Sequence, residues 1–353
     1  MNKKTLFPVT YGFFLLAVCI IFLFGSSDLD GVDAESSGRE KYKKFIFQPY
    51  KSHVLFEAVS FVSKDSSSSA FTFDKEIIEK LKKLLENKIK ESGAEVSLAL
   101  KDLESGEELL IHAEEMMHAA SLMKVPVMIE VFRQAERGKY SLEDKIFVTN
   151  QFKSIVDGSI YSLQAADDSD EKIYKLIGEK LSIRNLVEHM ITVSSNLATN
   201  ILIELVGAKN VMETMEEMGI YNMKVLRGVE DTKAYEKGLN NRTDALSMMR
   251  VMLSIAEGKA ASPEACKEMI EILAQQKFRA KIPAGIPEEI KVANKTGSIT
   301  RIDHDAAIVF PEGQKPYVLV ILTRGLENRE DAKQLISNLS RIIYYSLTKH
   351  KTR

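Results

Sequence analysis

The spacing of apolar side chains predicts how the folded part of the chain begins. Apolar residues recur at helical spacing from Ile77 to Ile89 through an otherwise charged segment, and Gly93 follows them. This pattern predicts a helix that ends near Gly93. The apolar runs Val96–Leu100 and Leu109–Ile111 flank a turn-forming sequence that contains Gly106. We therefore expect a β-hairpin directly after the first helix.

From residue 121 to about residue 275 the hydrophobic pattern is largely helical. A mostly apolar helix is predicted from Ser121 to Arg137, where Gly138 ends it. The other clear helical stretches are Ile183–Ile191, Leu197–Val206 and Ala245–Ala256.

Strand patterns return near the C-terminus, at Ile290–Asn294, His304–Phe310 and Tyr317–Leu322, and a last helix is predicted from about Asn328 to Leu347. Two strands at the start and three at the end predict one sheet built from both ends of the chain, with a helical block inserted between them. We therefore predict an α+β fold whose active site lies where the sheet meets the helices.

Residues 1–27 have the layout of an export signal or a membrane anchor. Lys3 and Lys4 precede an apolar run, and Gly25-Ser26-Ser27 follows it, which is the order found in cleaved signal peptides. Thr5–Phe24 is uncharged and just long enough to span the roughly 30 Å of a bilayer core as an uncleaved anchor. We favour cleavage. In either case we expect an exported chain, periplasmic or secreted, that meets a membrane only through residues 5–24.

The remaining sequence divides into two parts. Residues 28–72 are charged at first and later contain Ser66-Ser67-Ser68-Ser69, so we interpret them as a linker or accessory segment. Residues 73–350 form the predicted catalytic domain. Cys19 lies in the apolar run, which leaves Cys266 without an intrachain partner if that run is removed.

Composition excludes several classes of function. The 353 residues include 48 Lys and Arg against 50 Asp and Glu, so the net charge of −2 offers no basic surface for nucleic acid. The 6 histidines show no close pairing, and we expect no zinc site and no cofactor. We also expect a monomer.

Three short motifs stand in one order along the chain: Ser121-Leu122-Met123-Lys124, then Ser194-Ser195-Asn196, then Lys295-Thr296-Gly297. Ser-x-x-Lys alone is weak evidence, because Ser169–Lys172 and Ser346–Lys349 also match it. Only the first match opens an apolar helix, where backbone N–H groups favour a developing negative charge. The ordered set predicts acyl transfer through a covalent serine intermediate.

The motifs, their order and the strand–helix–strand plan resemble the serine β-lactamase and penicillin-binding-protein superfamily, and class A β-lactamases in particular. The resemblance covers roughly residues 75–350. It implies an α/β sandwich-like fold with an antiparallel five-stranded sheet, an inserted all-helical subdomain and an active site at their junction. It also implies a small-molecule substrate, either a β-lactam or a peptide like those of peptidoglycan.

Residue roles follow from the resemblance, position by position. Ser121 matches the acylated serine, Lys124 the lysine that takes its proton, and Ser194 the hydroxyl that relays a proton to the leaving nitrogen. The remaining matches concern substrate binding: Asn196 holds a substrate carbonyl, Lys295 and Thr296 meet its carboxylate, Gly297 follows them, and the backbone N–H groups of Ser121 and Ser298 form the oxyanion hole.

Two departures from the family pattern affect these expectations. Ser195 stands where the family usually has an aspartate. We expect the side chain at this position to have a structural role, so the replacement is compatible with an intact site. The glutamate that activates water for deacylation has two candidates. Glu230 lies at about the usual interval after Ser194 but lacks the Leu-Asn that normally follows, whereas Glu236 has Leu239-Asn240 at the right spacing but lies close to the next helix. We favour Glu230.

Three functional readings remain open at this stage. The first is a class A β-lactamase-like hydrolase, the second a D,D-peptidase or esterase that acylates but deacylates poorly, and the third a non-catalytic cell-wall-binding module. His304-Asp305 suggests a Ser-His-Asp triad, but Lys124 already supplies a base, so we expect the pair to make a sheet-edge hydrogen bond. Tyr161 is a weak positional match to a residue at the pocket mouth.

Overall fold

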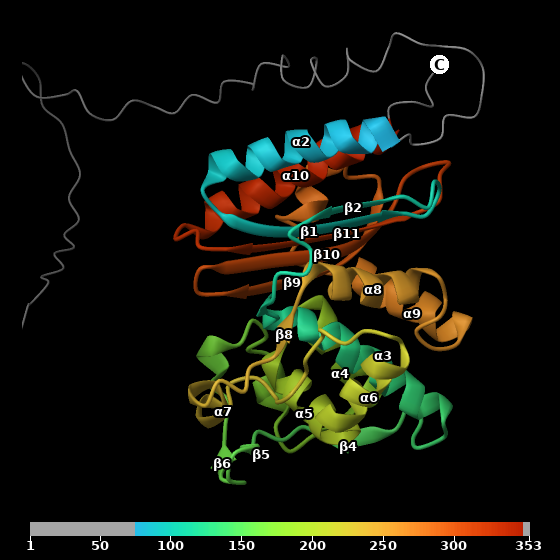
Figure 1. Cartoon of the computed structure of the whole chain (residues 1–353). Coiled ribbons are helices and arrows are strands. Elements are labelled where there is room, and N and C mark those ends of the chain that lie inside the picture. The colour runs from blue at the N-terminus through green and yellow to red at the C-terminus, as the bar shows by residue number, and fades with distance from the viewer. Residues whose placement is uncertain (1–74, 349–353) are drawn as a thin grey trace, which may run out of the picture. The chain divides into compact units, whose positions relative to one another are not determined.

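The structure, a computed structural model, describes residues 75–348. In this part of the chain five strands form one antiparallel sheet with the order β2-β1-β11-β10-β9 (Figure 1). The strands are β1 (Glu95–Asp102), β2 (Glu108–Ile111), β9 (Lys291–Ile299), β10 (Ile302–Phe310) and β11 (Tyr317–Arg324). The predicted export segment and the predicted linker lie outside the described residues.

The sheet joins the two ends of the described chain directly. Strand β1 pairs with β11 over its full length, from Glu95 opposite Arg324 to Asp102 opposite Tyr317. The α+β fold with an antiparallel five-stranded sheet is therefore confirmed. Lys295-Thr296-Gly297 lies within β9, although the pattern placed it just after a strand.

Both faces of the sheet are covered, so its central strands are buried on both sides. Leu98 and Leu100 of β1 pack in a core with α2 (Lys75–Ser92) and α10 (Arg329–Thr348). Ala99, between them, belongs to the core on the opposite face, as the two-residue period of a strand requires. Figure 1 shows α2 and α10 stacked together on one side of the sheet and the other helices on the opposite side.

The inserted block is mainly helical and occupies the chain between β2 and β9. Its α-helices are α3 (Lys124–Glu136), α4 (Ile183–Thr192), α5 (Asn196–Val206), α6 (Ala208–Glu217), α7 (Thr232–Glu236), α8 (Ala245–Ala256) and α9 (Pro263–Ala274). The 3-10 turns are η1 (Ala120–Met123), η2 (Ala165–Asp167), η3 (Ile173–Leu176) and η4 (Ile282–Gly285). Short strands pair as β3 (Met117–His118) with β8 (Arg242–Thr243), β4 (Lys145–Phe147) with β7 (Lys180–Ser182), and β5 (Phe152–Lys153) with β6 (Ile160–Tyr161).

Helix starts in this block follow capping chemistry that is visible in the sequence. Ser182, Asp244 and Ser262 each accept a hydrogen bond from the backbone N–H three residues on, at the starts of α4, α8 and α9. Such caps satisfy a backbone donor that the helix itself leaves free. Within residues 75–348 no helix is long and apolar enough to cross a membrane.

Candidate active site

Ser121 lies at a corner between β3 and α3, as the second residue of η1, and is partly exposed. The single helix predicted from Ser121 to Arg137 is divided in the structure into η1 and α3, which begins at Lys124. Ala120 has a φ of +46°, a conformation that a non-glycine residue keeps only where its surroundings hold it. The serine is therefore presented from a strained and well-supported turn.

Strand β9 passes close against this turn at Gly297, where a larger residue would be tightly packed. A Cβ on Gly297 would lie 3.1 Å from Ala120 Cβ and 3.2 Å from Ser121 N. Nearly all real Cβ contacts are longer than this. The third motif is thus brought beside the first through backbone packing, which is the close approach that glycine allows.

Lys124 is completely buried on the first turn of α3. Its Nζ donates to the carbonyl of Ser194 at 2.7 Å and to Asn196 Oδ1 at 2.9 Å, and it lies 3.3 Å from Ser194 Oγ. Burial lowers the pKa of Lys124 from 10.5 to about 7, although the carboxylates of Asp168 and Glu230 oppose this change. A substantial fraction of the amine is therefore neutral near pH 7 and able to accept a proton.

Ser194 Oγ lies between two lysine side chains. Lys295 Nζ donates to it at 2.9 Å, and Lys124 Nζ approaches it from the other side. Lys295 is also completely buried, and burial together with the cation of Lys124 lowers its pKa well below the usual value. The first, second and third motifs thus meet at one hydroxyl group, that of Ser194.

Ser195, the residue that departs from the family pattern, is the N-cap of α5. Its hydroxyl accepts the backbone N–H of Ala198 at 3.2 Å, and the side chain is completely buried. The preceding residue, Ser194, has a φ of +60°, so the motif turn is strained like the one at Ala120. Ser195 therefore has a capping role in this structure.

Glu230 reaches the same group of side chains from the loop before α7. Its Oε1 accepts a hydrogen bond of 2.9 Å from Asn196 Nδ2, whose own carbonyl oxygen accepts from Lys124. Partial desolvation raises the pKa of the Glu230 carboxyl, while the hydrogen bond from Asn196 opposes the rise. Glu236 lies apart, exposed at the C-terminal end of α7. Of the two candidates, only Glu230 contacts the motif residues.

A neighbouring asparagine that the sequence did not single out fixes the backbone before Glu230. Asn200 Oδ1 accepts the N–H of Val229 at 2.7 Å, and its Nδ2 donates to the Val229 carbonyl at 3.0 Å. Tyr161 donates its hydroxyl to the same carbonyl at 3.3 Å. Glu230 itself has a φ of +62°, so these contacts hold a strained residue in place. Tyr161 thus supports the loop.

Behind Thr296 and Ser298, a buried cation completes this wall of the site. Lys281 Nζ donates to the Gly297 carbonyl at 3.1 Å and to Ser298 Oγ at 2.9 Å, and it pairs with Asp303 at 2.9 Å. Burial lowers the pKa of Lys281, and Asp303 opposes the change. Lys281 carries no motif signal, because only the folded chain brings η4 behind β9.

His304 and Asp305 do not form a catalytic pair. They are neighbours on β10, so their side chains point to opposite faces of the sheet. The His304 ring lies among backbone groups: Nδ1 is 3.1 Å from the N of Thr323 and 2.9 Å from the Asp303 carbonyl, and Nε2 is 2.9 Å from the His118 carbonyl. Asp305 instead accepts from Asn294. The predicted sheet-edge position is wrong, since β10 is an interior strand.

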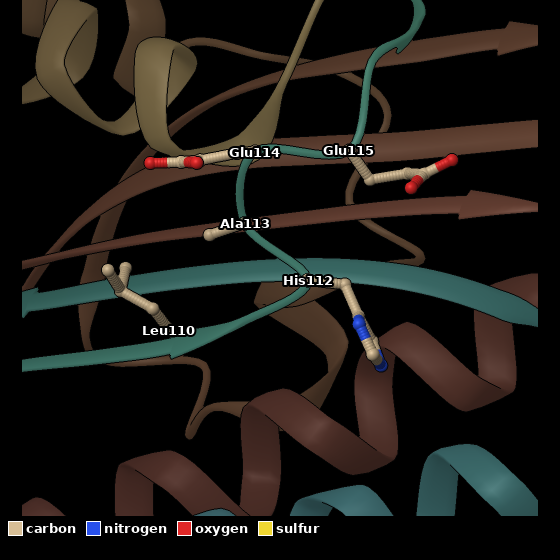
Figure 2. A pocket seen from close by; sticks show the side chains of 5 residues that line it. All are labelled: Leu110, His112, Ala113, Glu114 and Glu115. Atoms are coloured by element: carbon tan, nitrogen blue, oxygen red, sulfur yellow. The ribbon is translucent and has the colours of Figure 1, made fainter.

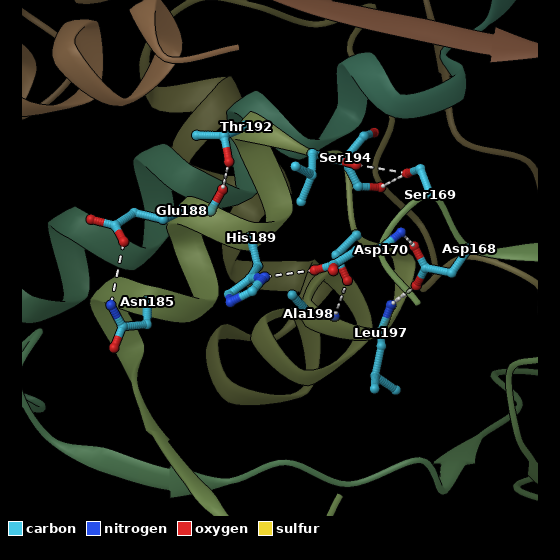
Figure 3. A network of polar contacts seen from close by, with 12 residues as sticks. Asp168, Ser169, Asp170, Asn185, Glu188, His189, Thr192, Ser194, Leu197 and Ala198 are labelled. Atoms are coloured by element: carbon cyan, nitrogen blue, oxygen red, sulfur yellow. Dashed lines mark hydrogen bonds and ion pairs between the residues drawn. The ribbon is translucent and has the colours of Figure 1, made fainter. Parts of the chain in front are cut away.

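The acidic stretch around Ser169 lies against the second motif, a contact that sequence reasoning missed. Asp168 accepts the backbone N–H groups of Asn196 and Leu197, and Ser169 Oγ donates to the Val193 carbonyl at 2.7 Å (Figure 3). The second Ser-x-x-Lys match is therefore a structural neighbour of the site.

A cavity of about 450 Å³ lies elsewhere, at the end of β2. It is lined by Leu110, His112, Ala113, Glu114 and Glu115. Figure 2 shows the His112, Glu114 and Glu115 side chains pointing in different directions, so they do not converge on one ligand. Among the described residues, no group of three His, Cys, Asp or Glu side chains could hold a metal ion.

Comparison with known proteins agrees with this geometry. The model of the Beta-lactamase enzyme family matches residues 77–347. A β-lactamase from Streptomyces albus G is 25% identical over 263 residues, covering 72% of this chain and 81% of that protein. A β-lactamase structure from Sphaerobacter thermophilus (24% identity, TM-score 0.63) covers 77% of this chain and 97% of its own. The structure of PBP-A (23% identity, TM-score 0.66) covers 76% and 96%. The chain therefore belongs to the beta-lactamase enzyme family.

Proposed function

We propose that the protein is a serine hydrolase of the class A β-lactamase type, which hydrolyses β-lactam amides through an acyl-enzyme on Ser121. One observation supports this above the others: Asn196 joins Lys124 to Glu230 through its two amide atoms, at 2.9 Å on each side. The acylating base and a carboxylate able to activate water are thereby held on one side chain. Acylation then has its base, Lys124, and deacylation has a carboxylate, Glu230.

In acylation, Ser121 Oγ attacks the lactam carbonyl carbon while neutral Lys124 takes the hydroxyl proton. The lowered pKa of Lys124 makes the neutral amine available near pH 7. As the C–N bond breaks, the leaving nitrogen needs a proton. Ser194 Oγ, which is in contact with both Lys124 and Lys295, delivers it and is reprotonated from the lysine side.

In deacylation, Glu230 takes a proton from a water molecule that attacks the ester carbonyl of the acyl-enzyme. The C–O bond to Ser121 then breaks, and the proton returns to Ser121 Oγ. Glu230 is exposed, so water can reach it from solvent. General-base assistance of this kind is worth roughly 10²–10⁴-fold in rate.

Substrate binding uses the wall formed by β9. Lys295 and Thr296 meet the substrate carboxylate, and Asn196 holds its side-chain carbonyl. The N–H groups of Ser121 and Ser298 bind the developing oxyanion, which is supported by the tight packing of Gly297 against the nucleophile turn. Lys281 adds positive charge behind this wall.

The second candidate function is a penicillin-binding D,D-peptidase or esterase on the same scaffold. The fold does not separate the two, because PBP-A shares it with β-lactamases. Hydrolysis of a β-lactam needs deacylation of the acyl-enzyme, so the position of Glu230 beside Asn196 favours the hydrolase.

The test is turnover of nitrocefin by the purified protein, with Ser121→Ala, Glu230→Gln and Glu236→Gln compared under the same conditions. We expect turnover that Ser121→Ala abolishes. Glu230→Gln should accumulate acyl-enzyme, seen by intact mass, with deacylation about 10²–10⁴-fold slower. Glu236→Gln is the matched control and should behave as the unmodified protein.

Each alternative has its own outcome. Stable labelling by a fluorescent penicillin without turnover would assign the protein to the acylating but non-hydrolysing class. Absence of any labelling would favour a non-catalytic cell-wall-binding module. Acyl-enzyme build-up in Glu236→Gln but not in Glu230→Gln would reverse the assignment of the deacylating residue.

A further inference from the structure

The second motif lacks the aspartate that the family usually has at its middle position, yet a buried carboxylate lies beside it. Asp168, in the loop after η2, is only 6% exposed. It comes from a part of the chain that has no motif and precedes Ser195 by more than twenty residues. The motif turn therefore has an acid next to it, supplied from a different segment.

We propose that Asp168 is a positioning residue for acylation: together with Ser169 it fixes the Ser194-Ser195-Asn196 turn against Lys124, in place of an aspartate within the motif. The proposal rests on the proposed function of Ser121, Lys124 and Ser194. Asp168 acts on the reaction through these groups.

The carboxylate of Asp168 holds the N-terminus of α5. It accepts the backbone N–H of Asn196 at 3.0 and 2.9 Å and that of Leu197 at 2.9 Å. These are the unpaired donors of the first helical turn, where a negative charge is most favourable. Tyr174 donates its hydroxyl to the same carboxylate at 3.1 Å. Asn196 is thereby anchored through its backbone while its side chain bridges Lys124 and Glu230.

Ser169 holds the other side of the same turn. Its hydroxyl lies 2.7 Å from the Val193 carbonyl and 3.3 Å from the Ser194 carbonyl, and Figure 3 shows it directed toward Ser194. Ser194 has a φ of +60°, which the turn must maintain against its own strain. Ser169 thus contacts the turn before Ser195, and Asp168 contacts it after Ser195.

Asp168 also contributes charge to the site. The carboxylates of Asp168 and Glu230 both raise the pKa of Lys124, and the cation of Lys124 in turn lowers the pKa of the neighbouring Lys295. Around Asp168 itself lie Tyr174 and Asp170. Removing the charge of Asp168 should therefore lower the pKa of Lys124 further and move the onset of acylation to lower pH.

A matched control lies two residues away. Asp170 is 7% exposed and pairs with His189 Nδ1 at 2.6 Å on α4. Figure 3 shows this pair separate from the bonds of Asp168 to α5. Asp170→Asn removes a carboxylate of equal burial from the same segment without removing a contact to Asn196 or Leu197.

The experiment measures the acylation rate of Asp168→Asn, Ser169→Ala and Asp170→Asn by stopped-flow mixing with a fluorescent penicillin between pH 5 and pH 9. Asp168→Asn should acylate roughly 10- to 100-fold more slowly. The asparagine side chain has the same shape, but its NH₂ group cannot accept hydrogen bonds from the backbone N–H groups at the start of α5. The pH at which its acylation rate reaches half of the maximum should be lower than in the unmodified protein. Ser169→Ala should slow acylation with an unchanged midpoint, and Asp170→Asn should change neither.

A purely structural role predicts a different result: Asp168→Asn and Asp170→Asn would both lower the melting temperature and leave the midpoint where it was. That outcome would overturn the proposal. If Asp168→Asn does not fold, Ser169→Ala tests the proposal instead. Unchanged acylation in Ser169→Ala would refute the claim that these residues fix the Ser194-Ser195-Asn196 turn.

Failure of the proposed function can be told apart from failure of this inference. If the unmodified protein is not labelled by penicillin, the proposed function fails. The inference is then tested by NMR titration of the Lys124 side chain in protein with isotope-labelled lysine. A lower pKa of Lys124 in Asp168→Asn than in Asp170→Asn supports the positioning role, and equal values refute it.

Discussion

Replacing Asn200 by alanine should impair deacylation much more than acylation. Asn200 is 2% exposed on α5, and its amide makes two hydrogen bonds with the backbone of Val229, the residue before Glu230. The hydrogen bonds of its side chain go to the Val229 backbone and to the Tyr161 hydroxyl. The substitution therefore releases the loop and leaves the acylating groups in place.

The size of the effect follows from these contacts. Each lost hydrogen bond is worth about 1 kcal/mol net, so the two bonds together contribute about 2 kcal/mol. The positive φ of Glu230 stores strain of about 1–3 kcal/mol. Once the two hydrogen bonds are lost, this strain favours movement of Glu230 away from its position beside Asn196. A change of about 2 kcal/mol corresponds to roughly 30-fold in the fraction of protein with Glu230 in position. We expect deacylation to fall by about that factor.

Stopped-flow acylation and single-turnover deacylation, followed by intact mass, separate the two steps. Acylation should change less than about threefold. Tyr161→Phe is the graded control, because it removes one 3.3 Å hydrogen bond to the same Val229 carbonyl and should slow deacylation only slightly. Equal losses in acylation and deacylation would contradict the reasoning, as would a Tyr161→Phe effect as large as that of Asn200→Ala.

Two further predictions concern acylation. The pKa of Lys124 is lowered to about 7, and the neutral amine is the reactive form. The acylation rate, measured by stopped-flow, should therefore rise with pH, with a midpoint near pH 7 and a plateau above pH 8. A midpoint near the ordinary lysine pKa would exclude Lys124 as the base. Gly297→Ala should slow acylation by about tenfold, because the new Cβ would lie too close to Ala120 Cβ and Ser121 N. The melting temperature, measured by calorimetry, should change little. Unchanged acylation kinetics would show that the turn at Ser121 can shift without affecting the reaction.

The elements of the fold could largely be predicted from local patterns. Apolar runs on either side of turn residues located the hairpin of β1 and β2, and helical spacing of apolar residues located α4, α5 and α8. The division between η1 and α3 could not be predicted in this way. It depends on the packing of β9 against Ala120, a contact between distant segments.

The candidate site shows the same division. Ser121, Lys124, Ser194, Asn196 and Lys295 could be selected from three motifs in order. The structure joins Lys124, Ser194, Asn196 and Lys295 by hydrogen bonds and places the backbone of Ser121 against Gly297. Both Glu230 and Glu236 have partial spacing signals, and the sequence favoured Glu230 only by its interval after Ser194. The choice depends on which loop carboxylate reaches Asn196, and only Glu230 does.

The sequence by itself indicated the proposed class of chemistry, because the residue types expected for nucleophile, base, proton relay and cationic wall occur in three motifs at recognisable spacing. Only the tertiary structure decided what surrounds them. Asp168, Asn200 and Lys281 have no motif of their own, and they contact the site through folding of separate loops and strands. Positions and pKa values of buried groups depend on such neighbours, since desolvation and charge act through space and not along the chain.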